Sequence, residues 1–312
     1  MAAVVPIPAG ERDAPDAPGA ATPAPVPPPA APLAAAPSAA ERARTWMWQR
    51  RRRSIYSAAL WVVSIAALLA FWYVGTRYRL EFYIRFTNVP TPAEVMQKLI
   101  EVNHSTKFVT NVWISVRRIL SGFGIAILTA VPLGILIGRY RLVRDLVMPA
   151  AEILRPIPAI AWVPMSIMLW PTNEVSIVFI TFLGSFFPIL LNTIHGVVSL
   201  DPVLVRAARC LGAGEAQLFR NVILPGVMPH IFTGLAVGIG VAWVSLIAAE
   251  MISGQFGVGY FTWEAYSLVN YAEIALGMIT IGMLGLICSG LIRLAGNVVM
   301  PWKAHSAAGG NR

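Results

Sequence analysis

The stretch that decides the fold class is IFTGLAVGIGVAWVSLIAAEMI, residues 231–252. It contains one charged residue, Glu250, in a run long enough for an α-helix to cross the hydrocarbon core of a bilayer, which is about 30 Å thick. The whole chain of 312 residues is 57% hydrophobic and only 12% charged, whereas a soluble domain carries about 25% charged residues. The sequence therefore predicts an integral membrane protein.

Further apolar runs predict an all-α, polytopic architecture with six transmembrane helices. They lie at 55–73, 119–137, 160–170, 175–197 and 274–292. The 160–170 run is the least regular, because prolines interrupt the stretch that leads into it. Prolines remove backbone donors and kink helices, so we expect a bent or re-entrant entry there. The prolines are Pro149, Pro156, Pro158 and Pro164.

The chain divides into four expected parts. Residues 1–54 are rich in Ala and Pro and carry the cluster Arg50 to Arg53, so we expect a disordered cytoplasmic tail. Residues 55–105 would form the first transmembrane helix, a retained anchor, with a periplasmic segment. Residues 106–300 would form the core, and 301–312 a short cytoplasmic tail.

The charge pattern indicates orientation. The net charge is +9, and the expected inner segments hold many arginines, whereas the expected outer links 171–174 and 253–271 contain no Lys or Arg. This is the positive-inside pattern, with the N-terminus cytoplasmic, and it makes a nucleic-acid partner unnecessary. One expected outer segment departs from the pattern, since it contains Arg77, Arg79, Arg85, Lys98, Lys107, Arg117 and Arg118.

Motifs typical of enzymes are absent from the sequence. It contains no phosphate-binding Gly-x-x-x-x-Gly-Lys-Ser/Thr loop, no His-Glu-x-x-His, no Gly-x-Ser-x-Gly and no Cys-x-x-Cys. Cys210 and Cys288 lie far apart and are expected to be packing residues, with no disulfide and no metal site. We expect no catalytic residue and no cofactor. The remaining candidate functions are a channel, a transporter subunit and a membrane scaffold.

The polar segment 199–230 is organised in an unusual way for a connector. Asp201 and Pro202 predict a helix start, with Asp as N-cap and Pro at the first position. Gly212 predicts the end of that helix, and a second short helix is expected over 214–223, stopped by Pro225. The first helix would carry an apolar stripe of Val203, Leu204, Ala207, Ala208 and Leu211. Such a pair of helices could dock into a groove of a partner.

This segment resembles a known family. Arg206-Ala207-Ala208, three residues, Gly212, nine residues, then Val222-x-Leu224-Pro225 is similar to the Glu-Ala-Ala-x3-Gly-x9-Ile-x-Leu-Pro loop of permease subunits of bacterial ATP-binding-cassette importers. Arg206 stands where the family has Glu, and Val222 where it has Ile. Segments 154–158, 187–193, 248–252 and 257–263 resemble the branch that handles nitrate, sulfonates, taurine or bicarbonate. The resemblance covers roughly residues 106–295.

The resemblance implies a type I importer permease in the bacterial inner membrane. Two permease subunits, expected as a homodimer, would form the pathway for a small anion. Separate ATPase subunits would bind the cytoplasmic loops and hydrolyse ATP, and a periplasmic or lipid-tethered binding protein would deliver the solute. The residues expected to couple to the ATPase are Arg206, Ala207, Ala208, Gly212, Val222, Leu224 and Pro225.

Inside the membrane, Glu250 is the one ionisable candidate. A charge at this depth is costly, so it should face the bundle interior or a water-filled cavity, unless it lies at the outer headgroup level. An anionic solute favours structural pairing over direct binding, but the sequence names no partner. Gly234 and Gly238 predict a close helix contact. Ser185, Asn192 and Thr193 are weak pathway candidates. The competing interpretation is a channel or scaffold that needs no nucleotide.

Overall fold

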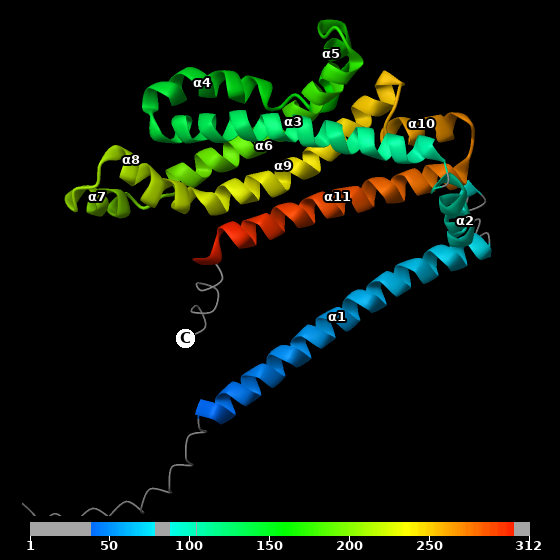
Figure 1. Cartoon of the computed structure of the whole chain (residues 1–312), viewed down its shortest axis with the longest axis horizontal. Coiled ribbons are helices and arrows are strands. Elements are labelled where there is room, and N and C mark those ends of the chain that lie inside the picture. Colours follow the sequence, from blue (N-terminus) through cyan, green and yellow to red (C-terminus); the bar gives the residue numbers. More distant parts are fainter. Residues whose placement is uncertain (1–38, 79–87, 104, 303–312) are drawn as a thin grey trace, which may run out of the picture. The chain divides into compact units, whose positions relative to one another are not determined.

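The computed structural model describes residues 39–78, 88–103 and 105–302. Every regular element in these ranges is helical, as the sequence predicts (Figure 1). The chain divides into two compact units, Met1–Ala66 and Ala67–Arg312. The expected disorder of residues 1–38 and the tail 303–312 lie outside the described residues.

Helix α1 (Ala39–Arg77) contains the first candidate span, Ile55–Arg77. The helix begins before the arginine cluster, so the expectation that disorder extends to residue 54 is wrong for residues 39–54. The physical reason is that Ala, Glu, Arg, Met and Gln, which are common between residues 39 and 50, are all strong helix formers that extend the span backwards. Apolar side chains such as Leu60 and Trp61 are exposed, as expected of a helix that faces lipid.

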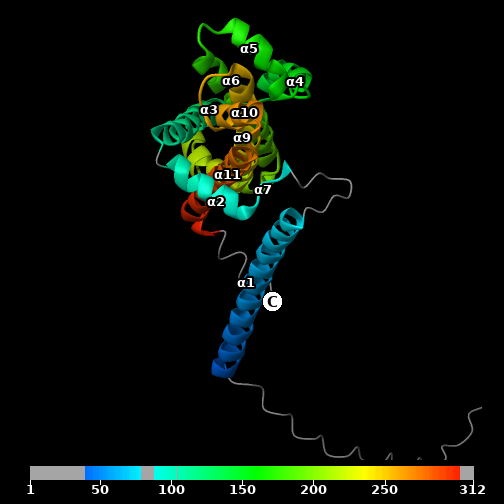
Figure 2. The ribbon, with the colours of Figure 1, turned by 90° about the vertical axis from the view of Figure 1, so that its right-hand side faces the viewer.

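The core of the second unit is built on three long helices, α3 (Thr106–Arg139), α6 (Asn173–Val198) and α9 (Leu224–Ser253). Helix α6 packs along both α3 and α9 (Figures 1 and 2). The largest buried apolar side chains of these helices form one cluster and include Ile119, Ile137, Ile177, Ile180, Ile189, Leu190 and Leu246.

Small residues allow α6 and α9 to approach closely. A Cβ built on Gly234 would lie 2.8 Å from the Cβ of Asn192, and one on Gly238 would lie 3.0 Å from Cγ1 of Ile189. No larger side chain fits there without displacement of the helices. The close contact predicted from the spacing of these two glycines is therefore confirmed, and it lies within one chain.

The expected third span is bent. Helix α4 (Arg141–Leu154) is followed by a 3-10 turn (Ala159–Trp162) and by the short α5 (Val163–Leu169), and the two halves meet at 84°. Five helices of the described chain are long and apolar enough to span a membrane, or six if this bent pair is one span. Ser166 and Ser176 fix α5 against α6, because each hydroxyl donates to the backbone oxygen of the other residue.

Three further helices pack around this core. Helices α10 (Val258–Ser267) and α11 (Tyr271–Val299) pack on α9 (Figure 1). Helix α2 (Pro92–Asn103) packs on α11, where Lys98 Nζ lies 3.2 Å from Oε1 of Glu273. Val95 of α2 is buried with Phe108, Phe261 and Leu276 in a small second cluster.

Candidate functional site

The first candidate site is the loop between α6 and α9, which carries helix α7 (Pro202–Cys210). Asp201 Oδ1 accepts a hydrogen bond from the backbone N–H of Val203 at 2.8 Å, and Pro202 occupies the first turn. Beyond the helix, Gly212 has a φ of +83°, a conformation that is strained for a residue with a Cβ. The predicted start and end of this helix are confirmed.

Helix α7 has an inner face and an outer face. Val205 and Ala208 pack against the core cluster, so they form the inner face. On the other side, Val203 and Leu204 are 55% and 56% exposed, and Leu211 just beyond the helix is 88% exposed. Ala207, also exposed, lies between them at helical spacing. The predicted apolar stripe is therefore largely uncovered, and Ala208 is the member that turns inward.

Ion pairs hold α7 against the end of α3. Glu215, at the start of α8 (Glu215–Leu218), receives Arg209 Nη2 of α7 at 2.6 Å and Arg139 Nη2 of α3 at 3.1 Å. Because the two arginines come from different helices, one carboxylate joins the loop to the helix bundle. Glu215 and Arg209 are exposed and Arg139 is half-buried, so these ion pairs add little to stability.

The second half of the loop differs from the prediction. Helix α8 is followed by a π-helical segment (Phe219–Ile223) that continues directly into α9. The prediction that Pro225 stops the second short helix is wrong. Pro225 lies in the first turn of α9, where a missing N–H costs little. Val222, Leu224 and Pro225 are half-buried beneath the loop. π-helical segments are rare, and they are frequently found at functional sites.

Arg206 lies at the rim of the exposed face of α7. Its side chain is exposed, and within the described residues it takes part in no ion pair. It borders a groove of about 270 Å³ that runs between α7 and the ends of α3 and α6. The other residues of this groove are Gly138, Arg139, Val197, Leu200, Pro202, Val205 and Ile223.

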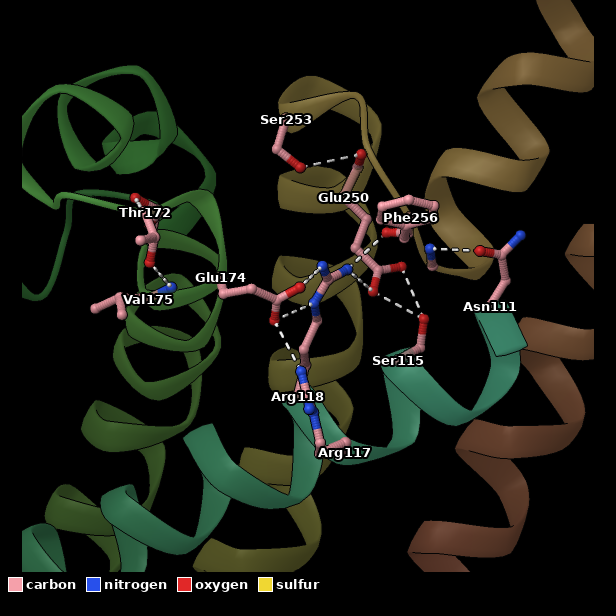
Figure 3. A network of polar contacts seen from close by, with 12 residues as sticks. Asn111, Ser115, Arg117, Arg118, Thr172, Glu174, Val175, Glu250, Ser253 and Phe256 are labelled. Carbon is pink, nitrogen blue, oxygen red and sulfur yellow. Dashed lines mark hydrogen bonds and ion pairs between the residues drawn. The ribbon is translucent and has the colours of Figure 1, made fainter. Parts of the chain in front are cut away.

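The second candidate site is a buried polar cluster at the other end of α9, which we call the Arg118 network (Figure 3). It comprises Asn111, Ser115, Arg118, Glu174, Glu250 and the backbone of residues 256–259. Arg118 is 1% exposed and Glu250 is fully buried. Arg118 Nη1 donates to Glu250 Oε1 at 2.9 Å and to the carbonyl of Phe256 at 2.6 Å. The partner that the sequence could not name for Glu250 is thus Arg118.

Two carboxylates share the Arg118 guanidinium. Its Nε donates to Glu174 Oε2 at 3.1 Å, and its Nη2 bonds the other oxygen of Glu174, so this pair is bidentate. Glu174 is 41% exposed and also lies 3.4 Å from Arg117. Figure 3 shows the guanidinium lying between Glu174, from the start of α6, and Glu250, from the end of α9. Three long helices therefore meet at one side chain of α3.

Glu250 has further partners that fix the turn before α10. Its carboxylate accepts from the hydroxyl of Ser115 at 2.8 Å and from the backbone N–H of Gly259 at 2.9 Å. Ser115 Oγ accepts in turn from the N–H of Val258 at 2.9 Å. The φ of Gly257 is +118°, and a Cβ there would fall within the Glu250 carboxylate. The conformation of the turn therefore depends on a glycine at position 257, and the turn supplies a backbone hydrogen bond to the buried Glu250 carboxylate.

Arg118 was expected in an outer segment, whereas the structure places it within α3, which begins at Thr106, with its side chain buried against α6 and α9. The sequence contained a signal for this. Asn111, Ser115 and Arg118 recur at intervals of four and three residues, so they share one face of a helix. Polar residues on one face of a long apolar helix indicate polar contacts inside the bundle.

The weak pathway candidates of α6 are engaged with their own helix. Ser185 donates to the carbonyl of Thr181 at 3.0 Å, Asn192 to that of Pro188 at 2.8 Å and Thr193 to that of Ile189 at 2.8 Å. Ser185 and Thr193 are fully buried between helices. These contacts satisfy the polar groups inside the bundle and give no indication of a solute path.

The five or six candidate spans of the described residues are those of a multi-pass membrane protein, and comparisons with known proteins name its family. The chain belongs to the family described as binding-protein-dependent transport system inner membrane component, whose profile matches residues 130–303. It is therefore a transport component of the ABC permease type.

Relatives with more specific names support this assignment. The chain is 31% identical to the nitrate import permease protein of Synechocystis over 77% of this chain and 88% of that protein. It is 30% identical to the taurine transport system permease protein of Escherichia coli over 85% and 95%, respectively. A crystal structure of an amino acid ABC transporter with histidines shares the fold, with a TM-score of 0.51, 17% identity and coverage of 64% of this chain and 97% of that one.

Proposed function

We propose that this protein is the permease subunit of an importer in the bacterial inner membrane, that ATPase subunits dock on α7, and that the transported solute is a small anion. The N-terminus and the 199–230 loop would lie in the cytoplasm, in agreement with the positive-inside pattern of the sequence. A binding protein would deliver the solute from outside, and two copies of the chain would form the pathway.

The observation that carries the docking proposal is the exposed apolar face of α7. Val203, Leu204 and Leu211 are more than half exposed on a short helix that Glu215 ties to the bundle. A loop that only connected two spans would gain nothing from exposing apolar side chains on a fixed helix. A face of this kind is suited to insertion into a groove of a partner protein.

The family supports the identity of that partner. Transport of this type requires energy, and the sequence holds no phosphate-binding loop of its own. A separate ATPase is consequently the partner that fits α7. A channel, the competing interpretation, would need neither a nucleotide nor a docking helix. The names of the nitrate and taurine relatives support a small anion as solute.

Docking can be tested with Gly212, next to which a side chain would meet open space. The full-length protein is co-expressed with the ATPase subunit of its transporter, and the complex is purified. Gly212→Trp should abolish co-purification because its bulk obstructs the approach of the partner. Gly212→Ala is the matched control, since it brings the same strained φ without the bulk, and it should keep the complex. Equal recovery with both variants would contradict docking at this face.

The native Cys210 offers a second readout, because it is exposed at the end of α7. In a Cys288→Ser background, a maleimide should modify Cys210 rapidly in the permease alone and slowly in the complex with the ATPase. An unchanged rate in a complex that is demonstrably intact would show that the ATPase binds elsewhere.

The solute is tested by reconstituting the complete transporter in liposomes with its binding protein. ATPase activity should rise when the binding protein is loaded with one of nitrate, bicarbonate, taurine or another sulfonate. Amino acids and sugars serve as controls. Stimulation by a sugar or an amino acid, with none by nitrate, bicarbonate, taurine or another sulfonate, would overturn the proposed solute class. A mass measurement of the purified complex reports whether it holds two copies of this chain.

A further inference from the structure

We propose that the ATPase surface that receives α7 carries a carboxylate opposite Arg206, so that this permease selects its ATPase by a charge opposite to that of the family pattern. The inference rests on the proposed docking of the ATPase and adds the chemistry of the contact. It concerns the rim of the docking face, whereas the apolar centre is formed by Val203, Leu204 and Leu211.

Every carboxylate of the loop is already engaged within the chain. Asp201 accepts the N–H of Val203 as the cap of α7. Glu215 is paired with Arg209 and Arg139. The loop 199–230 contains no other Asp or Glu. Glu215 is therefore neutralised within the chain, whereas Asp201, at the start of α7, caps the helix and takes part in no ion pair within the described residues.

The charges of the loop that take part in no ion pair with another described residue are Asp201, Arg206 and Arg220, so their sum is positive. Arg206 and Arg220 are both exposed, and neither takes part in an ion pair within the described part of the chain. At 100° per residue, Arg206 projects from the flank of α7 next to Ala207, between the exposed apolar face and the opposite side of the helix. Docking of the apolar face thus brings the Arg206 guanidinium to the edge of the contact.

Charge at the edge of an interface decides which partner is accepted. Opposite charges there speed association and fix register, while like charges in contact reject a partner. The family pattern has Glu at this position, and a partner surface that complements Glu would present a cation. Such a surface would repel Arg206, whereas a carboxylate at this position of the ATPase would attract it.

The Arg206 side chain suits recognition of a carboxylate. A guanidinium offers planar, bidentate hydrogen bonding to the two oxygens of a carboxylate, and it stays charged at every physiological pH. It borders the groove formed by α7 and the ends of α3 and α6, whose other residues are mostly apolar. An Asp or Glu of the partner can approach there with little competition from other charges of the loop.

The test measures association of the full-length permease in nanodiscs of neutral lipid with its cognate ATPase, as a function of KCl concentration. Arg206→Glu should weaken binding about tenfold at low salt, since it replaces an attraction by a repulsion, and Arg206→Gln should fall between it and the wild type. The wild type should lose affinity as KCl rises, and Arg206→Gln should lose less. The matched control is Arg155→Glu, an exposed arginine at the end of α4.

A charge exchange locates the partner group. Each acidic residue of the ATPase docking groove is replaced in turn by Lys, and one of these variants should bind the Arg206→Glu permease better than the wild-type permease. Unchanged affinity and unchanged salt dependence in Arg206→Glu would overturn the inference while leaving the docking proposal intact. Absence of any association with the wild type would refute the docking proposal itself.

Discussion

Arg118 is the residue on which the buried network depends, because its guanidinium contacts both Glu250 and Glu174. Removal of one partner of a buried ion pair leaves an uncompensated charge and costs about 3 to 5 kcal/mol. Arg118→Met should therefore lower the melting temperature of the detergent-solubilised protein strongly. Glu250→Gln should be milder, because a glutamine can keep the contact with Ser115 and Arg118 keeps Glu174.

The double variant Arg118→Met with Glu250→Gln should be more stable than Arg118→Met alone, since no charge is then left unpaired in the interior. Thermal unfolding of the four proteins in one detergent checks this order. Strictly additive losses would show that the two side chains do not stabilise each other. If Glu250→Gln changed neither stability nor uptake, a role of Glu250 in pairing would be refuted.

Gly257 gives a second prediction at the residue scale. Both Gly257 and Gly254 have positive φ values, +118° and +70°, but only Gly257 lies against the Glu250 carboxylate. Gly254→Ala should cost about 1 to 2 kcal/mol for the backbone conformation alone. Gly257→Ala should cost clearly more, because the added methyl group also displaces a buried charge. Equal melting temperatures for the two variants would contradict this account of the turn.

At the scale of elements, the contact of α9 with α6 predicts that two Gly→Ala substitutions in α9 change the stability of the protein in opposite directions. A Cβ on Gly240 meets nothing within 4 Å, whereas one on Gly234 would lie 2.8 Å from Asn192. Gly240→Ala should stabilise α9 by up to about 1 kcal/mol, because Ala is the better helix former. Gly234→Ala should destabilise, because the helices must separate. Melting temperatures that shift in the same direction would refute the argument.

The sequence predicted those features of the fold that depend on residues close together in the chain. The ends of α7 follow from Asp201, Pro202 and Gly212, and the bend after α4 follows from its prolines. The early start of α1 and the continuation of the helix through Pro225 were not predicted. Neighbouring residues that favour helix extended both helices beyond the boundaries expected from the local sequence. The pairing of Arg118 with Glu250 joins positions 132 apart in sequence, and no local pattern contains it.

At the scale of the whole molecule, the two ends of α9 are expected on opposite sides of the membrane. In a Cys288→Ser background, a membrane-impermeant maleimide should label Cys210 in inverted vesicles and not in intact cells. Leu268→Cys, placed in the exposed turn between α10 and α11 with both native cysteines replaced, should show the reverse. Labelling of Cys210 from the outside would invert the proposed orientation.

The length of α9 has a mechanical consequence. The helix has 30 residues, and Glu250 lies 26 residues beyond Leu224, so roughly 39 Å of helix separates the loop from the Arg118 network. If α9 acts as a lever that pivots at the Arg118 network, a displacement of the loop by one helical turn, about 5.4 Å, tilts the helix by only about 8°. Atoms within about 5 Å of this fulcrum then move by less than about 1 Å.

Such a lever would let the ATPase side swing while the buried ion pair stays closed throughout the cycle. Spin labels at the exposed Arg117 and Leu268 should then keep their separation between the nucleotide-free and ATP-bound transporter, whereas a label at Leu211 should move relative to both. A large change between Arg117 and Leu268 would mean that the fulcrum itself opens.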